Sequence, residues 1–429
     1  MKIRLLPLLV LFLVSALHAQ DNLEHRLFEL PDVIFKQIET PEDYIAAYEL
    51  RIKQPIDHTD PTKGHFYQRA FLSHRGFDRP TVMATEGYNR GGNRIYELTN
   101  IVDGNQIDIE HRYFGESIPE NPDYTHLNLE QATADLHHIN RIFRKLYTGK
   151  WLSTGISKGG QTTIFYRYLY PQDVDVSVPY VAPLNLSLED ERIYDWLEKA
   201  GTEECRNDIE RVQRTILENR EEALTLLRWY ARGAKLDFNY LTFEQAFEYA
   251  VLEYPFSFFQ WGSDCTKIPA ADADFEEVLV HFMDISGIAF FSDRDVAYFG
   301  SHYYQAGTQM GYYGYEAAPF KDLLKALPND KNPSAVFMPD GKPPVFNGEL
   351  PNKVAKWLKT NGNNFIYIYG KNDTWSATGV PPSEKTNSLW IVMDGKSHGD
   401  ARIKNMTAEE KQRVEEKLEE WLGDDFELR

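Results

Sequence analysis

The sequence predicts an α/β fold, in which helices cover both faces of a mainly parallel sheet and a large helical segment interrupts the strands. Short apolar segments that suit strands alternate with helical patterns over residues 81–181, and this alternation is typical of parallel sheets. Charged helical patterns replace the strands over residues 186–352. Strand-like runs return at residues 364–369 and 388–393, before a final helix.

The first nineteen residues have the composition of a secretory signal peptide. Lys2 and Arg4 precede an apolar run from Leu5 to Ala16, and the small residue Ala19 follows. The run is shorter than the roughly 20 apolar residues that a membrane-spanning helix needs. We therefore expect residues 1–19 to be removed and the chain to be exported, to the periplasm or the medium, without stable insertion into a membrane.

The chain carries an excess of acidic residues. Its 65 Asp and Glu residues outnumber its 46 Lys and Arg residues, which gives a formal net charge of −19. A strongly negative protein is repelled by phosphate backbones and by anionic lipids. We therefore expect neither nucleic acid nor an anionic membrane as a partner.

Two cysteines, Cys205 and Cys265, lie in the middle of the chain. In an oxidising compartment an even number of cysteines favours a disulfide. Two isolated cysteines do not complete a structural zinc site, and the sequence has no H-E-x-x-H motif. We predict a disulfide between Cys205 and Cys265 and no bound metal.

The individual elements follow from hydrophobic periodicity. Residues 44–56 and 65–72 alternate on either side of a turn-rich stretch and predict an antiparallel hairpin. The strands and helices that follow are expected at residues 81–85, 106–110, 129–146 (helix), 151–156, 157–170 (helix) and 174–181.

The helical segment that follows has a different composition. Charged helical patterns cover residues 189–197 and 209–232, and residues 254–261 are rich in aromatic side chains. These aromatic side chains could line a pocket or pack in a core. After the two last strands, the capping box formed by Thr407 and Glu410 predicts the start of the final helix.

Residues Gly155 to Gly159 form a G-x-S-x-G motif around Ser157. In this motif the serine occupies a strained turn between a strand and a helix, and the small glycines let the chain pass closely. An apolar strand precedes the motif and a helical pattern follows it. This context favours a nucleophilic serine over an ordinary glycine-rich turn.

A nucleophilic serine needs a neutral imidazole to take its proton and a carboxylate to orient that imidazole. Asp373 and His398 each follow one of the last two predicted strands, and the order serine, acid, histidine is that of α/β-hydrolases. We predict a catalytic triad of Ser157, Asp373 and His398, with Asp394 as a competing candidate for the acid. This mechanism requires no cofactor.

Together these features predict an α/β-hydrolase fold with a largely helical cap inserted after the sixth strand. Residues 20–185 and 353–429 are expected to form the catalytic domain, and residues 186–352 the cap. The order of predicted strands, insertion and triad residues is the one that a hydrolase with a lid shows.

The oxyanion hole should use two backbone N–H groups. One belongs to Lys158, which follows the nucleophile. The other should come from the loop after residues 81–85, where we favour the N–H of Tyr88. Gly87 would let the backbone approach the substrate carbonyl, although this residue is equally consistent with an ordinary turn glycine. The side chain of Lys158 has no predicted catalytic part and can point to solvent.

Several segments of the chain resemble those of a known family. They are residues 110–117, 155–160 and 170–183 and the loops that hold Asp373 and His398. At these segments the chain resembles the S37 (PS-10) peptidase family, which is related to bacterial tripeptidyl aminopeptidases. It is more distantly similar to the S28 family of Pro-X carboxypeptidase and dipeptidyl peptidase II. The resemblance implies the same triad and an exopeptidase confined by the cap.

We predict a serine exopeptidase that releases tripeptides, or else dipeptides, from the N-termini of peptide substrates, with a preference that could involve proline. A Pro-X carboxypeptidase-like peptidase and an esterase or lipase on the same triad stay open as alternatives. The complete set of serine, acid and histidine argues against a third alternative, an inactive binding protein.

An amino-terminal exopeptidase needs a carboxylate for the substrate's ammonium group, because a buried unpaired charge is costly. Glu86 and Glu110, near the ends of adjacent predicted strands, are candidates for substrate binding. Glu110 could instead pair with Arg112 or His111 and brace its loop. Acidic residues of the cap could serve equally well.

Overall fold

The computed structural model describes residues 22–327 and 332–423. Within these residues, nine strands form one sheet in the order β1-β2-β3-β5-β4-β6-β7-β8-β9. Neighbours are antiparallel from β1 to β5 and parallel from β5 to β9 in this order. The strands are β1 (Val33–Gln37), β2 (Ala46–Pro55), β3 (His65–His74), β4 (Thr81–Thr85), β5 (Asn105–Ile109), β6 (Trp151–Ile156), β7 (Val176–Tyr180), β8 (Ile366–Gly370) and β9 (Leu389–Met393).

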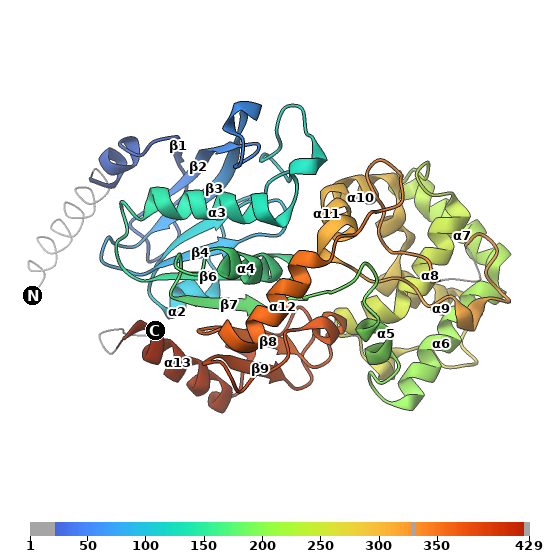
Figure 1. Cartoon of the computed structure of the whole chain (residues 1–429). Coiled ribbons are helices and arrows are strands. Elements are labelled where there is room, and N and C mark those ends of the chain that lie inside the picture. The colour runs from blue at the N-terminus through green and yellow to red at the C-terminus, as the bar shows by residue number, and fades with distance from the viewer. Residues whose placement is uncertain (1–21, 328–331, 424–429) are drawn as a thin grey trace, which may run out of the picture.

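Helices cover both faces of this sheet (Figure 1). Side chains of adjacent strand residues point to opposite faces, so Met83 packs with Ile139 of α3 while Val82 packs with Leu98 of α2. The helices on the first face are α3 (Leu129–Phe143), α4 (Lys158–Leu169) and α12 (Glu349–Asn361), and those on the second are α2 (Glu97–Ile101) and α13 (Ala408–Leu422). This is the α/β-hydrolase fold that the sequence predicts.

A helical cap separates β7 from β8 and forms the right-hand side of Figure 1. Its buried apolar side chains make a core of their own, which Trp375 from the loop after β8 joins. The helices of the cap are α5 (Arg192–Leu197), α6 (Glu203–Glu218), α7 (Arg220–Ala234), α8 (Phe243–Gln260), α9 (Phe275–Ser286), α10 (Asp293–Tyr298) and α11 (Gly300–Gln305), which continues into the π-helical turn η5 (Ala306–Met310).

Two expectations about elements need correction. The chain forms an additional first strand, β1, so the cap follows the seventh strand, β7, which is the sixth of the predicted ones. The single helical pattern over residues 209–232 contains the end of α6 and most of α7, which meet at Asn219. The side-chain amide of Asn219 donates to the carbonyl oxygen of Thr215 at 2.9 Å, and such local bonds compete with a continuous helix.

The long cap helix α8 contains a proline. Pro255 has no N–H to donate to the carbonyl oxygen of Val251, and an unpaired buried carbonyl would be costly. The side chain of Gln213 on α6 donates to this oxygen at 2.8 Å. The helix therefore passes through the proline with its backbone satisfied.

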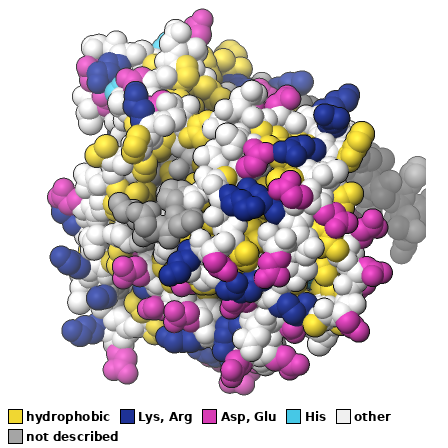
Figure 2. All heavy atoms as spheres, turned by 90° about the vertical axis from the view of Figure 1, so that its right-hand side faces the viewer, with side chains coloured by type: hydrophobic (Ala, Val, Ile, Leu, Met, Phe, Trp, Pro, Cys, Tyr) yellow, Lys and Arg dark blue, Asp and Glu magenta, His cyan; other side chains and the backbone are white. Residues whose placement is uncertain are grey.

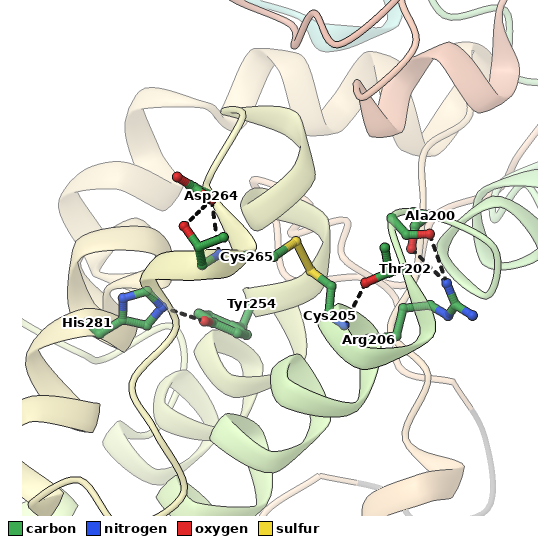
Figure 3. The surroundings of a disulfide bond; sticks show 10 residues. Ala200, Thr202, Cys205, Arg206, Tyr254, Asp264, Cys265 and His281 are labelled. Carbon is green, nitrogen blue, oxygen red and sulfur yellow. Dashed lines mark hydrogen bonds between the residues drawn. A yellow bond between two sulfur atoms is a disulfide. The ribbon is translucent and has the colours of Figure 1, made fainter.

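The predicted disulfide is confirmed: Cys205 in the first turn of α6 is bonded to Cys265. Figure 3 shows it beside two other local constraints. Thr202 caps α6 by accepting from the Cys205 N–H, and the Tyr254 hydroxyl lies 2.8 Å from Nε2 of His281. The bond therefore ties one end of α6 to the segment after α8.

Acidic and basic side chains are interspersed over the end of the cap, as Figure 2 shows. Within the described ranges, none of the helices has the length and apolar character that crossing a membrane would need. The predicted signal peptide lies outside the described residues. The capping box of Thr407 and Glu410 opens α13 as predicted.

Candidate active site

Ser157 occupies the turn between β6 and α4 with an unusual backbone conformation. Its φ is 57° and its ψ is −122°, a strained combination for a residue with a side chain. The backbone N–H of Ser157 donates to Tyr180 O at 2.9 Å, and its carbonyl oxygen accepts from the N–H of Gln161 at 2.9 Å. The surrounding strand and helix thus hold the serine in this conformation.

The glycines of the motif are required by close backbone contacts. A Cβ atom on Gly155 would lie 2.3 Å from the carbonyl carbon of Gly159, and one on Gly159 would lie 2.4 Å from the carbonyl oxygen of Thr85. Both distances are far below van der Waals contact. The glycines therefore let β4, β6 and α4 meet beneath Ser157.

Asp373 and His398 form a hydrogen-bonded pair. Asp373 Oδ2 lies 2.8 Å from Nδ1 of His398, and Asp373 Oδ1 accepts from the backbone N–H of Trp375 at 3.1 Å. Asp373 is fully buried. Since a carboxylate only accepts, Nδ1 is the donor of the pair and Nε2 is left for a second partner.

The competing acid, Asp394, lies elsewhere. Its side chain is 86% exposed and pairs with Lys371 at 2.8 Å. Its hydrogen bonds therefore give it no part in orienting His398. The cap contributes instead, because the backbone N–H of His398 donates to Gln260 O at the end of α8 at 3.0 Å.

A cavity of about 690 Å³ lies between the sheet and the cap, and Ser157 and His398 both line it. Cap residues form much of its wall. The aromatic-rich segment 254–261 contributes both to the cavity and to the core. Ser257, Gln260 and Trp261 line the cavity, whereas Phe258 belongs to the core of the cap.

The predicted oxyanion residues meet beside Ser157. Lys158 is the first residue of α4, so its N–H has no acceptor within the helix. A Cβ on Gly87 would lie 2.6 Å from Lys158 Cβ, which shows how closely the two segments approach. Tyr88 lines the cavity.

The side chain of Lys158 does not point to solvent, contrary to the expectation. It is 2% exposed and its Nζ donates to Gly87 O at 2.6 Å. The ring of Phe114 lies 4.9 Å from Nζ. Burial lowers the pKa of Lys158 well below its ordinary value. Lysine side chains are usually exposed, so the sequence did not indicate this buried hydrogen bond.

The two predicted substrate carboxylates lie in different surroundings. Glu86 lines the cavity, where it accepts from Tyr96 and from Arg94. Glu110 is fully buried and is not among the residues that line the cavity. It accepts from the N–H groups of Arg90 and Glu116 and from Ser117 Oγ, at 2.7, 2.8 and 2.8 Å.

Glu110 therefore braces its loop, the alternative that the sequence left open, although through these groups rather than through Arg112 or His111. The cavity also contains a carboxylate that the sequence did not single out, Glu253 on α8. A glutamate within a helix carries no motif, so only the packing of the cap reveals its position.

Comparison with known proteins identifies the family. Residues 18–425 match the family described as PS-10 peptidase S37. The chain belongs to this peptidase family.

Relatives of this S37 peptidase include a prolyl tri/tetrapeptidyl aminopeptidase of Streptomyces mobaraensis, 32% identical over 94% of this chain and 86% of the relative. A serine protease of Bipolaris victoriae is 27% identical over 37% of this chain and 35% of its own. The solved proline iminopeptidase of Mycobacterium smegmatis aligns over 87% of this chain and 97% of its own, with 12% identity and a TM-score of 0.39. The family match and the Streptomyces relative show that the chain is an enzyme, a serine hydrolase of a peptidase family.

Proposed function

We propose that this S37 family member is an exported serine exopeptidase that releases tripeptides or dipeptides from the N-termini of peptide substrates. The observation that carries the proposal is the Asp373–His398 pair beside the cavity that Ser157 lines at its strained turn. The Streptomyces relative, described as a prolyl tri/tetrapeptidyl aminopeptidase, supports the amino-terminal direction.

The proposal includes the division of the chain. Residues 1–19 act as the signal peptide, residues 20–185 and 353–429 form the catalytic domain, and residues 186–352 form the cap. The disulfide between Cys205 and Cys265 supports export, since such bonds persist in oxidising compartments.

In the proposed reaction His398 acts as general base. Its Nε2 takes the Ser157 proton while Oγ attacks the carbonyl carbon of the scissile bond, and Asp373 stabilises the resulting imidazolium. The imidazolium then donates the proton to the leaving amine. The amino-terminal fragment remains as an ester on Ser157 until a water molecule, deprotonated by the same ring, hydrolyses it.

Lys158 supports this step through its backbone and its side chain. Its N–H, with that of Tyr88, donates to the oxyanion. In a trans peptide the C=O and the N–H point in opposite directions. The bond from Lys158 Nζ to Gly87 O therefore directs the Tyr88 N–H away from the lysine side chain, and so holds the second donor in place.

Profiling of a mixed peptide library by mass spectrometry tests the proposal, with the wild-type protein compared with Ser157→Ala. We expect the wild-type protein alone to release short N-terminal peptides. Cleavage by both proteins would contradict Ser157 as nucleophile. If neither cleaves peptides while a fluorophosphonate still labels Ser157 of the wild type, the chain remains a serine hydrolase, the esterase alternative is favoured and the peptidase proposal fails.

A further inference from the structure

Glu253 is a buried carboxylate of the cavity that has no positively charged partner in the described part of the chain. It lies on α8, is 4% exposed and lines the same cavity as Ser157 and His398. Its oxygens accept from Ser257 Oγ at 2.5 Å and from the hydroxyls of Tyr313 and Tyr315 at 2.8 and 2.9 Å. Among the residues that the structure describes, no Lys, Arg or His forms an ion pair with it.

The other acidic residues nearby are neutralised. Within the cavity, Glu86 pairs with Arg94, and Asp295 pairs with Arg294 at 2.7 Å. Glu248 lies five residues before Glu253 on the same helix and is also fully buried. It pairs with Arg220 at 2.6 Å and accepts from three consecutive backbone N–H groups, those of Lys325, Ala326 and Leu327.

The cationic groups of the cavity are engaged away from Glu253. Arg94 pairs with Glu86, and Arg402 donates to the carbonyl oxygens of His398 and Ala401 at 3.1 and 2.8 Å. Burial and the charge of Lys158 lower the pKa of His302 to about 3, so this ring is neutral. His398, which also lines the cavity, pairs with Asp373. Among the described residues of the cavity wall, none of these groups forms an ion pair with Glu253.

Phenol groups surround Glu253 instead. Tyr303 of α11 and Tyr312, Tyr313 and Tyr315 after η5 all have pKa values raised well above normal by burial and by the charge of Glu253. They are neutral hydroxyls. Burial, opposed by the hydrogen bonds from Ser257, Tyr313 and Tyr315, raises the pKa of Glu253 to about 7.

An ionised carboxylate with this burial is costly unless a cation reaches it. The rings of Tyr303, Tyr312 and Tyr313 line the cavity, and aromatic faces also attract cations. The site therefore has the chemistry of a receptor for an ammonium group that arrives from the cavity.

We propose that Glu253 binds the α-ammonium group of the peptide substrate while Ser157 attacks the scissile carbonyl. This inference rests on the proposed function and names the group that the cap recognises. It transfers the role that the sequence assigned to Glu86 and Glu110 to a residue of the cap. The spacing between Glu253 and Ser157 then sets the number of residues released.

Binding measurements on Ser157→Ala test the inference without turnover. The probes are the peptide Ala-Ala-Pro-Ala-Ala and its N-acetyl form, titrated by calorimetry at pH 8. We expect the free peptide to bind at least about tenfold more tightly. Adding Glu253→Gln should reduce this ratio to near 1, while adding the matched change Glu244→Gln, at an exposed position of the same helix, should keep it.

A second measurement needs no substitution at Glu253. Titration of Ser157→Ala with the free peptide at pH 7, in buffers of different ionisation enthalpy, should show a net release of roughly 0.4 proton. The half-protonated carboxyl loses about 0.5 proton when the ammonium binds, and the amine, with a pKa of about 7.7–8.0, takes up about 0.1. The acetylated peptide should release none. Equal proton exchange with both peptides would overturn the inference.

Turnover separates the two levels of the proposal. If the wild-type protein cleaves both peptides equally well, the amino-terminal function itself fails. If the wild-type protein cleaves only the free peptide, and Glu253→Gln keeps the tenfold preference in binding, the function stands and the assignment of Glu253 is wrong.

Discussion

Glu248 and Glu253 are both buried carboxylates of the cap helix α8, but they differ in their hydrogen-bond and ion-pair partners. Glu248 has a guanidinium and three backbone N–H groups as partners, so its charge is satisfied within the protein. Among the described residues, Glu253 has only hydroxyl donors, and it lines the cavity. Glu248 therefore holds residues 325–327 against α8. Glu253, in our proposal, binds the ammonium group of the substrate.

The sheet and the cap also differ in what they contribute to the active site. The sheet presents Ser157, Asp373 and His398 on turns after parallel strands, where the fold dictates their positions. The cap closes over them with aromatic side chains and Glu253. In this account the sheet performs the chemistry and the cap selects the substrate, so changes on the two sides should affect different kinetic constants.

Substitution on the sheet side should have the largest effect. Asp373→Asn should lower kcat by about 10⁴-fold, because the amide no longer fixes the tautomer of His398. Asp394→Asn, at an exposed position paired with Lys371, is the matched control and should leave kcat unchanged. Steady-state kinetics with the best library peptide measures both, and equal loss in the two variants would contradict the assignment of the acid.

Lys158→Met should lower kcat about 10²-fold, with a smaller change in KM. The substitution removes the donor to Gly87 O and frees the loop that carries the second oxyanion N–H, whose loss costs this order of rate. Fluorophosphonate labelling of Ser157 and the melting temperature report whether the variant is folded. A folded variant with wild-type kcat would show that the side chain only fills space.

The pH dependence should sharpen the contrast further. Protonation of Glu253, whose pKa burial raises to about 7, removes the negative charge that attracts the ammonium group. KM for free peptides should therefore be lowest between about pH 7 and pH 8, where Glu253 is ionised and much of the peptide's amino group (pKa about 7.7–8.0) is still charged, and should rise by up to about tenfold per pH unit below pH 7. With Glu253→Gln this rise in KM should disappear, and its persistence would point to another group.

The disulfide should affect stability more than catalysis. Neither Cys205 nor Cys265 lines the cavity, so Cys205→Ser combined with Cys265→Ser should keep kcat/KM within about twofold at 25 °C. The bond spans 60 residues, and its loss should lower the free energy of unfolding by about 4 kcal/mol. Urea denaturation of both proteins measures this, and an unchanged midpoint would contradict it.

Much of the catalytic side could be predicted from the sequence. The G-x-S-x-G motif reflects a steric requirement, because a Cβ atom on Gly155 or Gly159 would clash with neighbouring backbone atoms. The late strands place Asp373 and His398 by topology alone, and their hydrogen bond agrees with that prediction. The triad's catalytic role stays a prediction until activity is measured.

The remainder depends on contacts between distant segments. The role of Glu253 depends on Tyr313 and Tyr315, some sixty positions further on, and the buried bond of Lys158 depends on the loop at Gly87. Strand β1 is an edge strand without a fully buried side chain, so it gives only a weak hydrophobic pattern. No local periodicity contains this information.

The most direct test of the account is the mass of the acyl-enzyme. A rapid acid quench of the wild-type protein with a defined hexapeptide, followed by intact-protein mass spectrometry and mapping of the adduct, would identify the fragment on the nucleophile. We predict an adduct on Ser157 whose mass equals the first two or three residues of the substrate. An adduct that contains every residue except the last, or an adduct on another residue, would contradict the account.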